Sequence, residues 1–270
     1  MTRIAVIGGG QMGEALVAGM INGGLAARNI IVCENNAERA SELSERYDIL
    51  TTDVEDAVES SDYVFVAVKP KDVKTVLAVL ADATATLENE IVVVSIAAGI
   101  PTVYYENQLS AGSPVIRVMP NTPMLVGKGV CAVSAGRYAR PEHVEEVCGL
   151  LGSVGTVLEV PEADMDMVTA ISGSGPAYFF LMVEAMIDAG VAMGLTRPVA
   201  AELTIGTISG SAKMLQESGK TPAQLRETVT SPGGTTAAGL RAFEDGGFRS
   251  TIYEVLDAVA EKSKEMRPKM

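Results

Sequence analysis

The sequence is poor in the residues that most metal sites and many nucleophilic active sites require. Its 270 residues include one histidine, His143, and three cysteines, Cys33, Cys131 and Cys148, which lie far apart and form no C-x-x-C pair. The sequence therefore lacks the ligands of a typical zinc site and the residues of a His-based catalytic triad. A chain of this length can also bury a full core without a disulfide framework. We expect no metal site.

Aromatic residues and positive charge are also scarce. The chain has no tryptophan, 5 phenylalanines and 7 tyrosines, and 21 basic against 34 acidic residues give a net charge of −13. An excess of negative charge repels phosphate backbones and anionic lipids, and base stacking requires aromatic side chains. We therefore expect no nucleic-acid partner.

Long hydrophobic runs are missing as well. The longest apolar stretch after the first strand, Ile91–Ile100, is shorter than the roughly 18 residues that a membrane span requires. The first residues combine a short apolar run with glycines and show no cleavage pattern of a signal peptide. These features predict a cytoplasmic protein that does not bind membranes.

The first 160 residues alternate short β-branched runs with segments of helical period, which is typical of a parallel sheet covered by helices on both faces. We therefore predict an α/β fold with an N-terminal Rossmann-type, doubly wound domain over residues 1–163. A further helix is predicted from Pro141, with His143 exposed on its polar side. The predicted strands are Arg3–Ile7, Ile30–Cys33, Tyr63–Val68, Ile91–Ser95, Val115–Val118, Val130–Val133 and Thr156–Val160.

Strand signals stop after about Asp164, and the rest of the chain is predicted to be helical. Its helical faces carry many small and apolar residues, so residues 164–270 are predicted to form an all-α domain that packs against a second copy. The predicted helices are Pro176–Met193, Pro198–Glu217, Pro222–Val229, Thr235–Asp245 and Arg249–Glu265, with prolines in first turns.

A glycine-rich segment links the first strand to the first helix and reads Ile7-Gly8-Gly9-Gly10-Gln11-Met12-Gly13. In this G-x-G-x-x-G spacing the first glycine allows a tight turn, the second lets a pyrophosphate approach the backbone, and the third lets the helix pack on the sheet. The helix N-terminus then holds the phosphates. The motif predicts a dinucleotide-binding site.

The residues after the second strand bear on the choice between NADH and NADPH. Glu34 lies near the offset at which an acid accepts the ribose hydroxyls of NAD. Asn35, Asn36 and Arg39 could instead hold a 2′-phosphate, so both cofactors stay open.

Other segments are predicted to follow strands at the same edge of the sheet, where cofactor and substrate bind. Lys69 is a candidate proton donor or a simple turn residue, and Asn121 is a candidate contact for the nicotinamide amide or part of a structural turn. In the helical half, Ser172–Pro176 and Thr230–Thr236 are predicted loops whose amides, at the start of a helix, could bind a carboxylate.

Taken together, the motifs resemble pyrroline-5-carboxylate reductases along essentially the whole chain. The most specific part is the segment Ser231–Leu240. The other matching segments are Gly8–Gly13, Ala67-Val68-Lys69-Pro70, Met119–Pro123 and Ser172–Tyr178.

The resemblance implies reduction of L-1-pyrroline-5-carboxylate to L-proline by NAD(P)H, the last step of proline biosynthesis. It also implies a homodimer with interleaved helical domains, assembled further into rings that are commonly decamers. Carried over by motif, Thr236 would place its hydroxyl on the ring nitrogen as the catalytic residue. The implied substrate-binding residues are Glu162, Ser231, Gly234, Thr235 and Thr236, and the implied cofactor contacts are Ile7–Met12, Ala67–Lys69 and Ile96, Ala97 and Ala98.

Two positions depart from the pattern of the bacterial members, which often carry Arg in place of Asn35 and Asn in place of Val54. With Glu34, these departures make NADH a candidate beside NADPH. Two alternative functions also stay open. One is reduction of another small cyclic imine, including six-membered rings, or the activity of a 3-hydroxyacid dehydrogenase, for which Lys213 and Lys220 would be the candidate lysines. The other is a non-catalytic module that senses the dinucleotide.

Overall fold

The computed structural model describes residues 2–85, 87 and 89–268. The chain forms two compact units, of which the second comprises Gly175–Asp257. The first unit contains the residues before Gly175 and also those from Ala258 onward, so the chain leaves it after Ser174 and returns to it. The domain boundary predicted at residues 163/164 lies within the first unit and stays a prediction.

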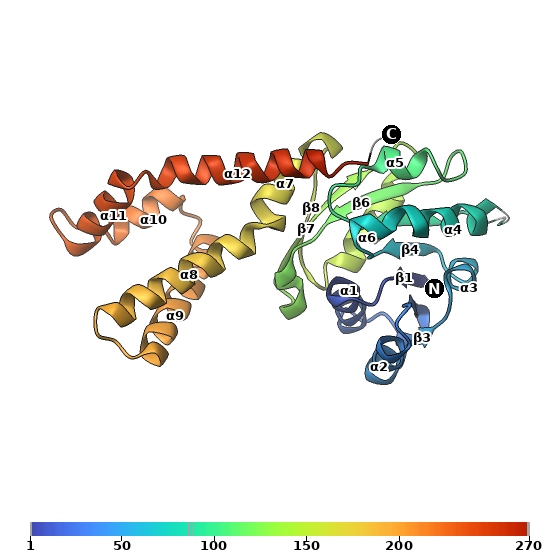
Figure 1. The fold of residues 1–270 in the computed structure, drawn as a ribbon, viewed down its shortest axis with the longest axis horizontal. Helices are drawn as coiled ribbons and strands as arrows, with labels where there is room; N and C mark the ends of the chain where they lie inside the picture. Colours follow the sequence, from blue (N-terminus) through green and yellow to red (C-terminus); the bar gives the residue numbers. More distant parts are fainter. Residues whose placement is uncertain (1, 86, 88, 269–270) are drawn as a thin grey trace. The chain divides into compact units, whose positions relative to one another are not determined.

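The first unit is built on an eight-stranded sheet of order β3-β2-β1-β4-β5-β6-β7-β8 (Figure 1). The seven predicted strands are confirmed with small shifts at their ends, whereas the two-residue edge strand β3 was not predicted. The strands are β1 Ile4–Ile7, β2 Ile30–Cys33, β3 Leu50–Thr51, β4 Tyr63–Val66, β5 Val92–Ser95, β6 Val115–Met119, β7 Gly129–Ala135 and β8 Gly155–Glu159.

The direction of two strands differs from the prediction of a parallel sheet. β7 runs antiparallel to β6, with Met119 opposite Ala132, and β8 runs parallel to β7. Only a short 3₁₀ turn, η3 (Thr122–Val126), lies between β6 and β7. A parallel crossover needs a dozen or more connecting residues, so the short connection forces the chain to reverse.

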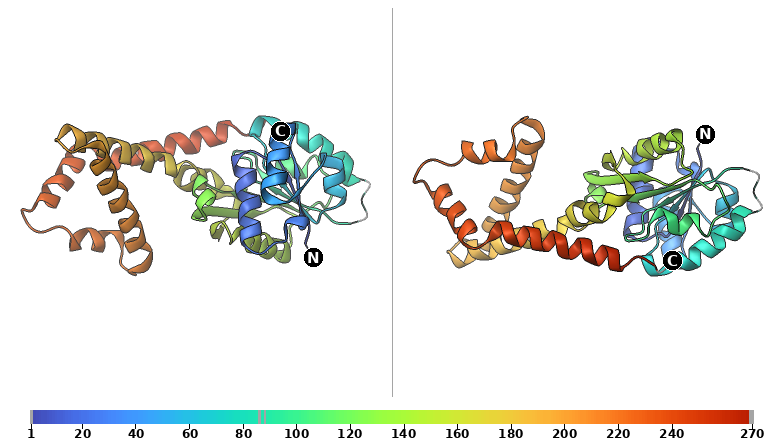
Figure 2. Two further views of the ribbon diagram at one scale, coloured as in Figure 1. Left: turned by 90° about the horizontal axis from the view of Figure 1, so that it is seen from below. Right: turned by 90° about the horizontal axis from the view of Figure 1, so that it is seen from above.

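Helices cover both faces of this sheet (Figure 2). In the first unit they are α1 Gln11–Asn22, α2 Ala37–Tyr47, α3 Val54–Glu59, α4 Val73–Ala85, α5 Thr102–Glu106, α6 Pro141–Leu151 and α7 Met165–Val168, with the 3₁₀ turns η1 Ala27–Asn29, η2 Pro70–Asp72, η3 and η4 Glu162–Asp164. Alternate residues of each buried strand point to opposite faces, which gives two hydrophobic layers.

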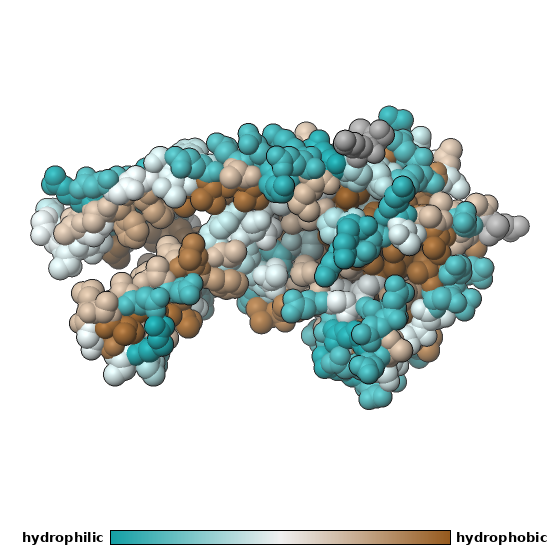
Figure 3. Space-filling view, in the orientation of Figure 1, coloured by the Kyte–Doolittle hydropathy of each residue, from teal (hydrophilic) through white to brown (hydrophobic). Residues whose placement is uncertain are grey.

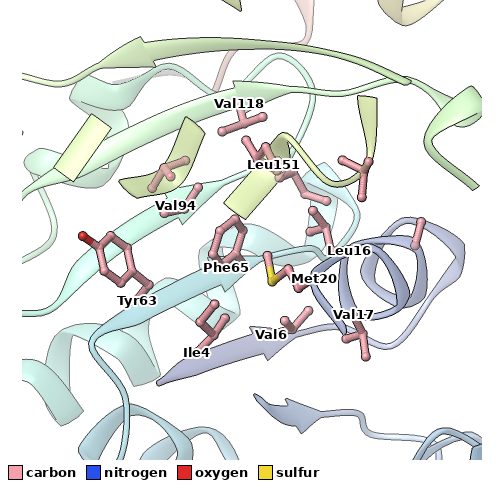
Figure 4. Close-up of a cluster of buried hydrophobic side chains, with 14 of the residues drawn as sticks. Ile4, Val6, Leu16, Val17, Met20, Tyr63, Phe65, Val94, Val118 and Leu151 are labelled. Carbon is pink, nitrogen blue, oxygen red and sulfur yellow. The ribbon is translucent and has the colours of Figure 1, made fainter. Parts of the chain in front are cut away.

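The first layer lies between the sheet and helices α1 and α6. Leu16 and Met20 of α1 pack against Val6 and Phe65 of the strands, and Leu151 of α6 joins them (Figure 4). The second layer lies under α3, α4 and α5 and includes Leu77 and Tyr105. Fully buried side chains on both faces fix the strands, and therefore fix the loops at their ends.

His143 does not lie on an exposed face of α6, so that prediction is wrong. Its side chain is 8% exposed. The ring Nδ1 accepts a hydrogen bond from the backbone amide of Arg140 at 3.3 Å, and Nε2 lies 3.2 Å from the Glu90 carboxylate. A side chain in the first turn of a helix can hydrogen-bond to the backbone of the N-cap residue in this way. His143 therefore lies among polar residues because it caps α6, and not because it is exposed.

The second unit is helical, as predicted. Pro198 and Pro222 lie in the first turns of their helices, where the missing amide costs no hydrogen bond. The helices are α8 Gly175–Ala192, α9 Arg197–Glu217, α10 Pro222–Thr228, α11 Thr235–Asp245 and α12 Phe248–Glu265, of which α12 ends in the first unit.

The stretch Ser172–Pro176 is not a loop, and that prediction is wrong. Thr169–Gly173 form a π-helical turn, η5, between α7 and α8. The Ser174 amide donates to the carbonyl of Thr169 at 2.8 Å, and the Ser172 hydroxyl donates to Val168 at 3.0 Å. Serine and glycine are compatible with a π turn inside a helix, and amides used in helical hydrogen bonds cannot form an anion site.

Apolar side chains are exposed over much of the second unit. Phe180 of α8 is 68% exposed and Leu203 of α9 is 58% exposed, and hydrophobic residues are visible on these helices in Figure 3. The continuous stretch Glu162–Ala192 is long and apolar enough, by length and composition, to cross a membrane. One such helix is weak evidence for a span, since a helix covered by another subunit passes the same test.

The returning end of α12 is held in the first unit by a buried carboxylate. Asp166 of α7 is 2% exposed. It accepts a hydrogen bond from Ser263 at 2.7 Å and forms an ion pair with Arg267. Met266 packs so close to Gly99 that a β-carbon added there would lie 3.1 Å from it. These contacts place residues from Ala258 onward in the first unit.

Candidate active site

The glycine-rich loop folds as its motif predicts. Gly8 has a φ of +107°, which favours glycine, and its amide donates to the carbonyl of Cys33 at 2.8 Å. A β-carbon on Gly13 would lie 1.9 Å from the Gly8 carbonyl oxygen, whereas one on Gly10 would meet nothing within 4 Å. The loop is thus packed tightly at two glycines and open at the middle one, beside the N-terminus of α1.

The other predicted residues of this loop have different surroundings. Ile7 is buried at the end of β1, and Gly9 is also buried. Gln11 begins α1 with an exposed side chain, whereas Met12 packs against the first hydrophobic layer. A bound phosphate would therefore meet the backbone of this loop, whose amides point out of the helix N-terminus.

Glu34 links the end of β2 to the glycine-rich loop. One carboxylate oxygen accepts a hydrogen bond from the Gly9 amide at 2.9 Å, and the other accepts one from the Asn36 amide at 2.9 Å. Asn36 caps α2 by accepting a hydrogen bond from the Arg39 amide. Asn35 lies between them and is exposed.

The guanidinium of Arg39 is turned toward α1. Its Nε donates to the Gly9 carbonyl at 2.9 Å, one terminal nitrogen pairs with Glu42 at 2.6 Å, and the other pairs with Glu14. Glu14 also pairs with Arg46. Arg39 is therefore engaged at all three nitrogens.

Two clefts meet at the end of β2, and Glu34, Asn35 and Val54 line both. One, of about 420 Å³, extends to the glycine-rich loop and the end of β4. The other, of about 700 Å³, extends over α2 and α3 and includes Asp53. The first brings together these predicted residues: Ile7, Gly8, Gly10, Glu34, Asn35, Ala67, Val68 and Lys69.

The ends of β4 and β5 approach this region differently. Lys69 is exposed on the cleft, and Pro70 begins η2 directly after it. Ile96 and Ala97 have buried side chains, and Ala98 packs beside Met119. The predicted contacts of residues 96–98 with a cofactor would therefore be made chiefly through their backbone.

Asn121 and Glu162 are bonded to other parts of the first unit. The Asn121 amide nitrogen donates to the carbonyl of Ser172 at 3.0 Å, and its oxygen accepts from the Val130 amide at 2.8 Å. Glu162 pairs at 2.7 Å with Arg117, whose side chain is 2% exposed. Both residues thus have a structural role, and their contacts with nicotinamide and substrate stay predictions.

The predicted substrate loop lies in the second unit. It runs from Thr230 to Gly234, which is the cap residue of α11 and whose amide donates to the Ser231 carbonyl at 3.0 Å. The first helical hydrogen bond of α11 is donated by Ala238 to Gly234, so the amides of Thr235 and Thr236 point out of the helix end. Thr235 and Thr236 are both exposed.

Several residues at the cofactor cleft were not predicted. Lys71 and Thr75 line it from η2 and α4. The Ala67–Pro70 segment was the available signal, since the residues after a strand end lie at the same edge. Glu14 was also missed, because its contacts with Arg39 and Arg46 join two helices far apart in the sequence.

Two of the three cysteines, Cys33 and Cys131, lack the properties of nucleophiles. Burial, and then the charges of Asp53 and Glu55, raise the pKa of Cys33 to about 12. Burial and the neighbouring Cys148 raise the pKa of Cys131 to about 11. The thiolate is the reactive form, so both groups are unreactive at neutral pH. Among residues 2–85, 87 and 89–268, no three metal-ligating side chains gather.

Comparisons with known proteins decide between the families that share this architecture. Residues 162–266 match the family model described as pyrroline-5-carboxylate reductase dimerisation, and residues 3–99 match one described as NADP oxidoreductase coenzyme F420-dependent. The chain is 50% identical to pyrroline-5-carboxylate reductase of Corynebacterium melassecola over 270 residues, covering 98% of this chain and 99% of the relative. The chain belongs to the pyrroline-5-carboxylate reductase family.

Other members of this family agree over the same length. The reductase of Mycobacterium tuberculosis (strain ATCC 25618 / H37Rv) is 48% identical over 287 residues, covering 99% of this chain and 97% of the relative. The structure of the reductase from Coxiella burnetii has a TM-score of 0.92 at 34% identity, covering 99% of both chains. The Plasmodium falciparum enzyme, solved with NADP bound, has a TM-score of 0.87 at 32% identity and covers 98% of both.

Proposed function

We propose that this protein reduces L-1-pyrroline-5-carboxylate to L-proline, the last step of proline biosynthesis, with NADPH or NADH as the reductant. The observation that carries the proposal is the full-length identity of up to 50% with pyrroline-5-carboxylate reductases. The glycine-rich loop and its cleft supply the corresponding chemistry. The protein is an oxidoreductase that acts on a C=N bond.

The residues present fit a nicotinamide dinucleotide. The open side of Gly10, where a β-carbon would meet nothing within 4 Å, leaves room for a pyrophosphate against the N-terminus of α1. The cleft of about 420 Å³ continues from this loop to Lys69. When bound, the dinucleotide supplies a hydride to ring C5 of the protonated imine, and the ring nitrogen keeps its proton in the product.

The loop at the start of α11 is proposed to hold the substrate. The exposed amides at this helix end favour a carboxylate without a cationic side chain, which suits Ser231, Gly234 and Thr235. Thr236 is proposed to hydrogen-bond the ring nitrogen through its hydroxyl. Glu162 is proposed to act near the substrate while paired with Arg117.

This assignment explains why few catalytic side chains are needed. A protonated C=N bond is already electrophilic, so the protein has mainly to position the ring and the reductant. Neither a nucleophile nor a metal is required by such a reaction. The buried thiols and the capping role of His143 are compatible with it.

The assembly is proposed from the helical half. The match to a dimerisation family over residues 162–266 and the exposed apolar faces of α8 and α9 support homo-oligomers. We propose a dimer with interleaved helical domains, assembled into a decamer, with residues 1–163 as the cofactor domain and 164–270 as the helical domain. The cytoplasm is the proposed location.

The test is a reductase assay that follows nicotinamide absorbance with pyrroline-5-carboxylate and either NADPH or NADH. Substrate-dependent oxidation of one or both reductants is expected, with proline as the product. Oxidation of the reductant only with a six-membered cyclic imine, or oxidation of a 3-hydroxy acid with the oxidised cofactor, would replace the proposed substrate. Dinucleotide binding without any turnover would support a sensing module instead.

A further inference from the structure

Arg39, which the sequence offers for a ribose 2′-phosphate, is turned toward α1. Arg39 lines neither of the two clefts that meet at Glu34. Its side chain is 24% exposed and is directed to Glu14, Glu42 and the Gly9 carbonyl. The arginine next to the glycine-rich loop is therefore engaged by carboxylates of α1 and α2.

Glu14 is the central acceptor of this arrangement. It lies in the first turn of α1, its side chain is 16% exposed, and it binds Arg39, Arg46 and the Tyr47 hydroxyl, the last at 2.9 Å. Burial acts to raise the pKa of Glu14, but the hydrogen bonds from Arg39, Tyr47 and Arg46 outweigh it and leave the pKa below its ordinary value. Glu14 is thus ionised at neutral pH and holds both arginines.

The cleft over α2 and α3 is acidic. Its charged lining residues are Glu34, Asp53 and Glu55, and neither lysine nor arginine lines it. The lysines of the region, Lys69 and Lys71, line the cleft that extends toward β4. A carboxylate at the end of β2 accepts ribose hydroxyls and repels a phosphate, so this end of the site favours an unphosphorylated ribose.

We propose that Glu14 is a specificity-determining residue for the dinucleotide. By holding Arg39 against α1 it keeps this cation away from the cleft edged by Glu34, so the site selects NADH over NADPH. This inference rests on the proposed reductase function, and it extends that function by assigning the reductant and a residue that sets the choice. Glu14 acts through Arg39 and touches neither substrate nor cofactor.

The test measures dissociation constants of NAD⁺, NADP⁺, NADH and NADPH for the full-length protein without substrate, together with kcat/KM for each reductant. The unmodified protein is expected to bind NADH more tightly than NADPH. Glu14→Gln removes the charge that holds one terminal nitrogen of Arg39 and leaves Glu42 and the Gly9 carbonyl as its partners. The weaker hold on Arg39 should tighten NADPH binding about three- to tenfold with little change for NADH, which is the range for one surface charge interaction.

A double variant shows whether the effect passes through Arg39. In Glu14→Gln with Arg39→Ala, the gain in NADPH affinity should disappear, because coupled residues do not contribute independently. Glu45→Gln on α2, where the exposed Glu45 accepts a hydrogen bond from Ser41, is the matched control and should leave both affinities unchanged.

Three results would overturn the proposal. They are tighter binding of NADPH by the unmodified protein, equal changes for both reductants in Glu14→Gln, or a gain that persists without Arg39. Failure of the reductase function itself gives a different result, since the dinucleotides would then bind with the expected selectivity while pyrroline-5-carboxylate is not reduced.

Discussion

The two units of the chain differ in where their apolar side chains lie. In the first unit, every residue of β1, β2, β4, β5 and β6 is buried. In the second unit, only Gly175 of α8 and only Ala200 and Thr204 of α9 are buried. One unit thus contains its own hydrophobic layers, whereas the other presents its apolar residues outward.

This difference shows how the chain divides its tasks. A sheet with buried strands and helices on both faces fixes the glycine-rich loop so closely that a single added β-carbon at Gly13 would clash. Exposed helices such as α8 and α9 need another surface to cover them, and the dimerisation family matches this part of the chain. Cofactor binding is therefore expected to depend on packing within one chain, and assembly on packing between chains.

Gly13→Ala should have the largest effect on the first unit. The new β-carbon would lie 1.9 Å from the Gly8 carbonyl oxygen, so we expect a loss of about 4 kcal/mol or more of stability and no measurable dinucleotide binding. Gly10→Ala is the control, because its β-carbon meets nothing within 4 Å. It should keep the melting temperature and weaken only dinucleotide binding. Equal melting temperatures for both variants would contradict the tight packing at Gly13.

Phe180→Glu tests the second unit. Phe180 is 68% exposed in α8, and a charge there should weaken subunit association about 100-fold or more, as for a central interface residue. Sedimentation velocity measures the loss of oligomers. Leu50→Glu, at a site 60% exposed on the sheet edge, should leave assembly intact. If the oligomer dissociates in Leu50→Glu and not in Phe180→Glu, subunit association depends on the first unit rather than on the second.

Thr236→Ala should lower turnover about 10- to 1000-fold, the range for losing one positioned polar group. Its kcat with pyrroline-5-carboxylate is compared with that of Thr228→Ala, whose hydroxyl donates to the Leu225 carbonyl at 2.6 Å. An unchanged kcat in Thr236→Ala would show that the Thr236 hydroxyl has no catalytic role. The second unit would then serve assembly without contributing a catalytic hydroxyl.

Asn121→Ala should destabilise the first unit by about 1–3 kcal/mol, because the Val130 amide and the Ser172 carbonyl each lose a partner. Urea unfolding measures the change. Asn35→Ala, at an exposed position, serves as the control for stability. If the KM for the reductant rises strongly while the free energy of unfolding changes little, the result would favour the nicotinamide contact over the structural role.

Thiol labelling should show the smallest difference between variant and unmodified protein, and it reports on the first unit alone. All three cysteines lie in the first unit, and burial raises the pKa of Cys33 to about 12 and of Cys131 to about 11. Their thiolates form only as the pH rises toward those values, so at about pH 8 only the partly exposed Cys148 should react quickly. Labelling of Phe180→Glu should match that of the unmodified protein, and rapid loss of all three thiols would show that the first unit depends on assembly.

Local patterns predicted most of the elements because their causes are local. The strand positions follow from β-branched runs, the starts of α9 and α10 follow from Pro198 and Pro222, and the glycine-rich loop follows from a fixed spacing. The direction of β7 was missed although its cause is also local, because the predicted strands Val115–Val118 and Val130–Val133 leave too short a connection for a parallel crossover.

The other missed features depend on partners far away in the chain. His143 is buried beside Glu90 of a distant segment, and Asn121 bonds to Ser172, 51 positions later. The glycines and serines before α8 are as compatible with a loop as with the π turn that forms. The loop Thr230–Thr236 was predicted from its glycines and hydroxyl residues before a helix, whereas the role of Thr236 toward the substrate was predicted from a resemblance.

The bond between Asp166 and the returning end of α12 affects how the chain is made. During synthesis, the sheet and α7 leave the ribosome well before Ser263 and Arg267, whose side chains bind this buried carboxylate. An ionised carboxylate without its partners is costly to bury. Completion of the first unit therefore waits for the second to emerge, and the nascent chain keeps one site of its sheet domain open until Ser263 and Arg267 have been made.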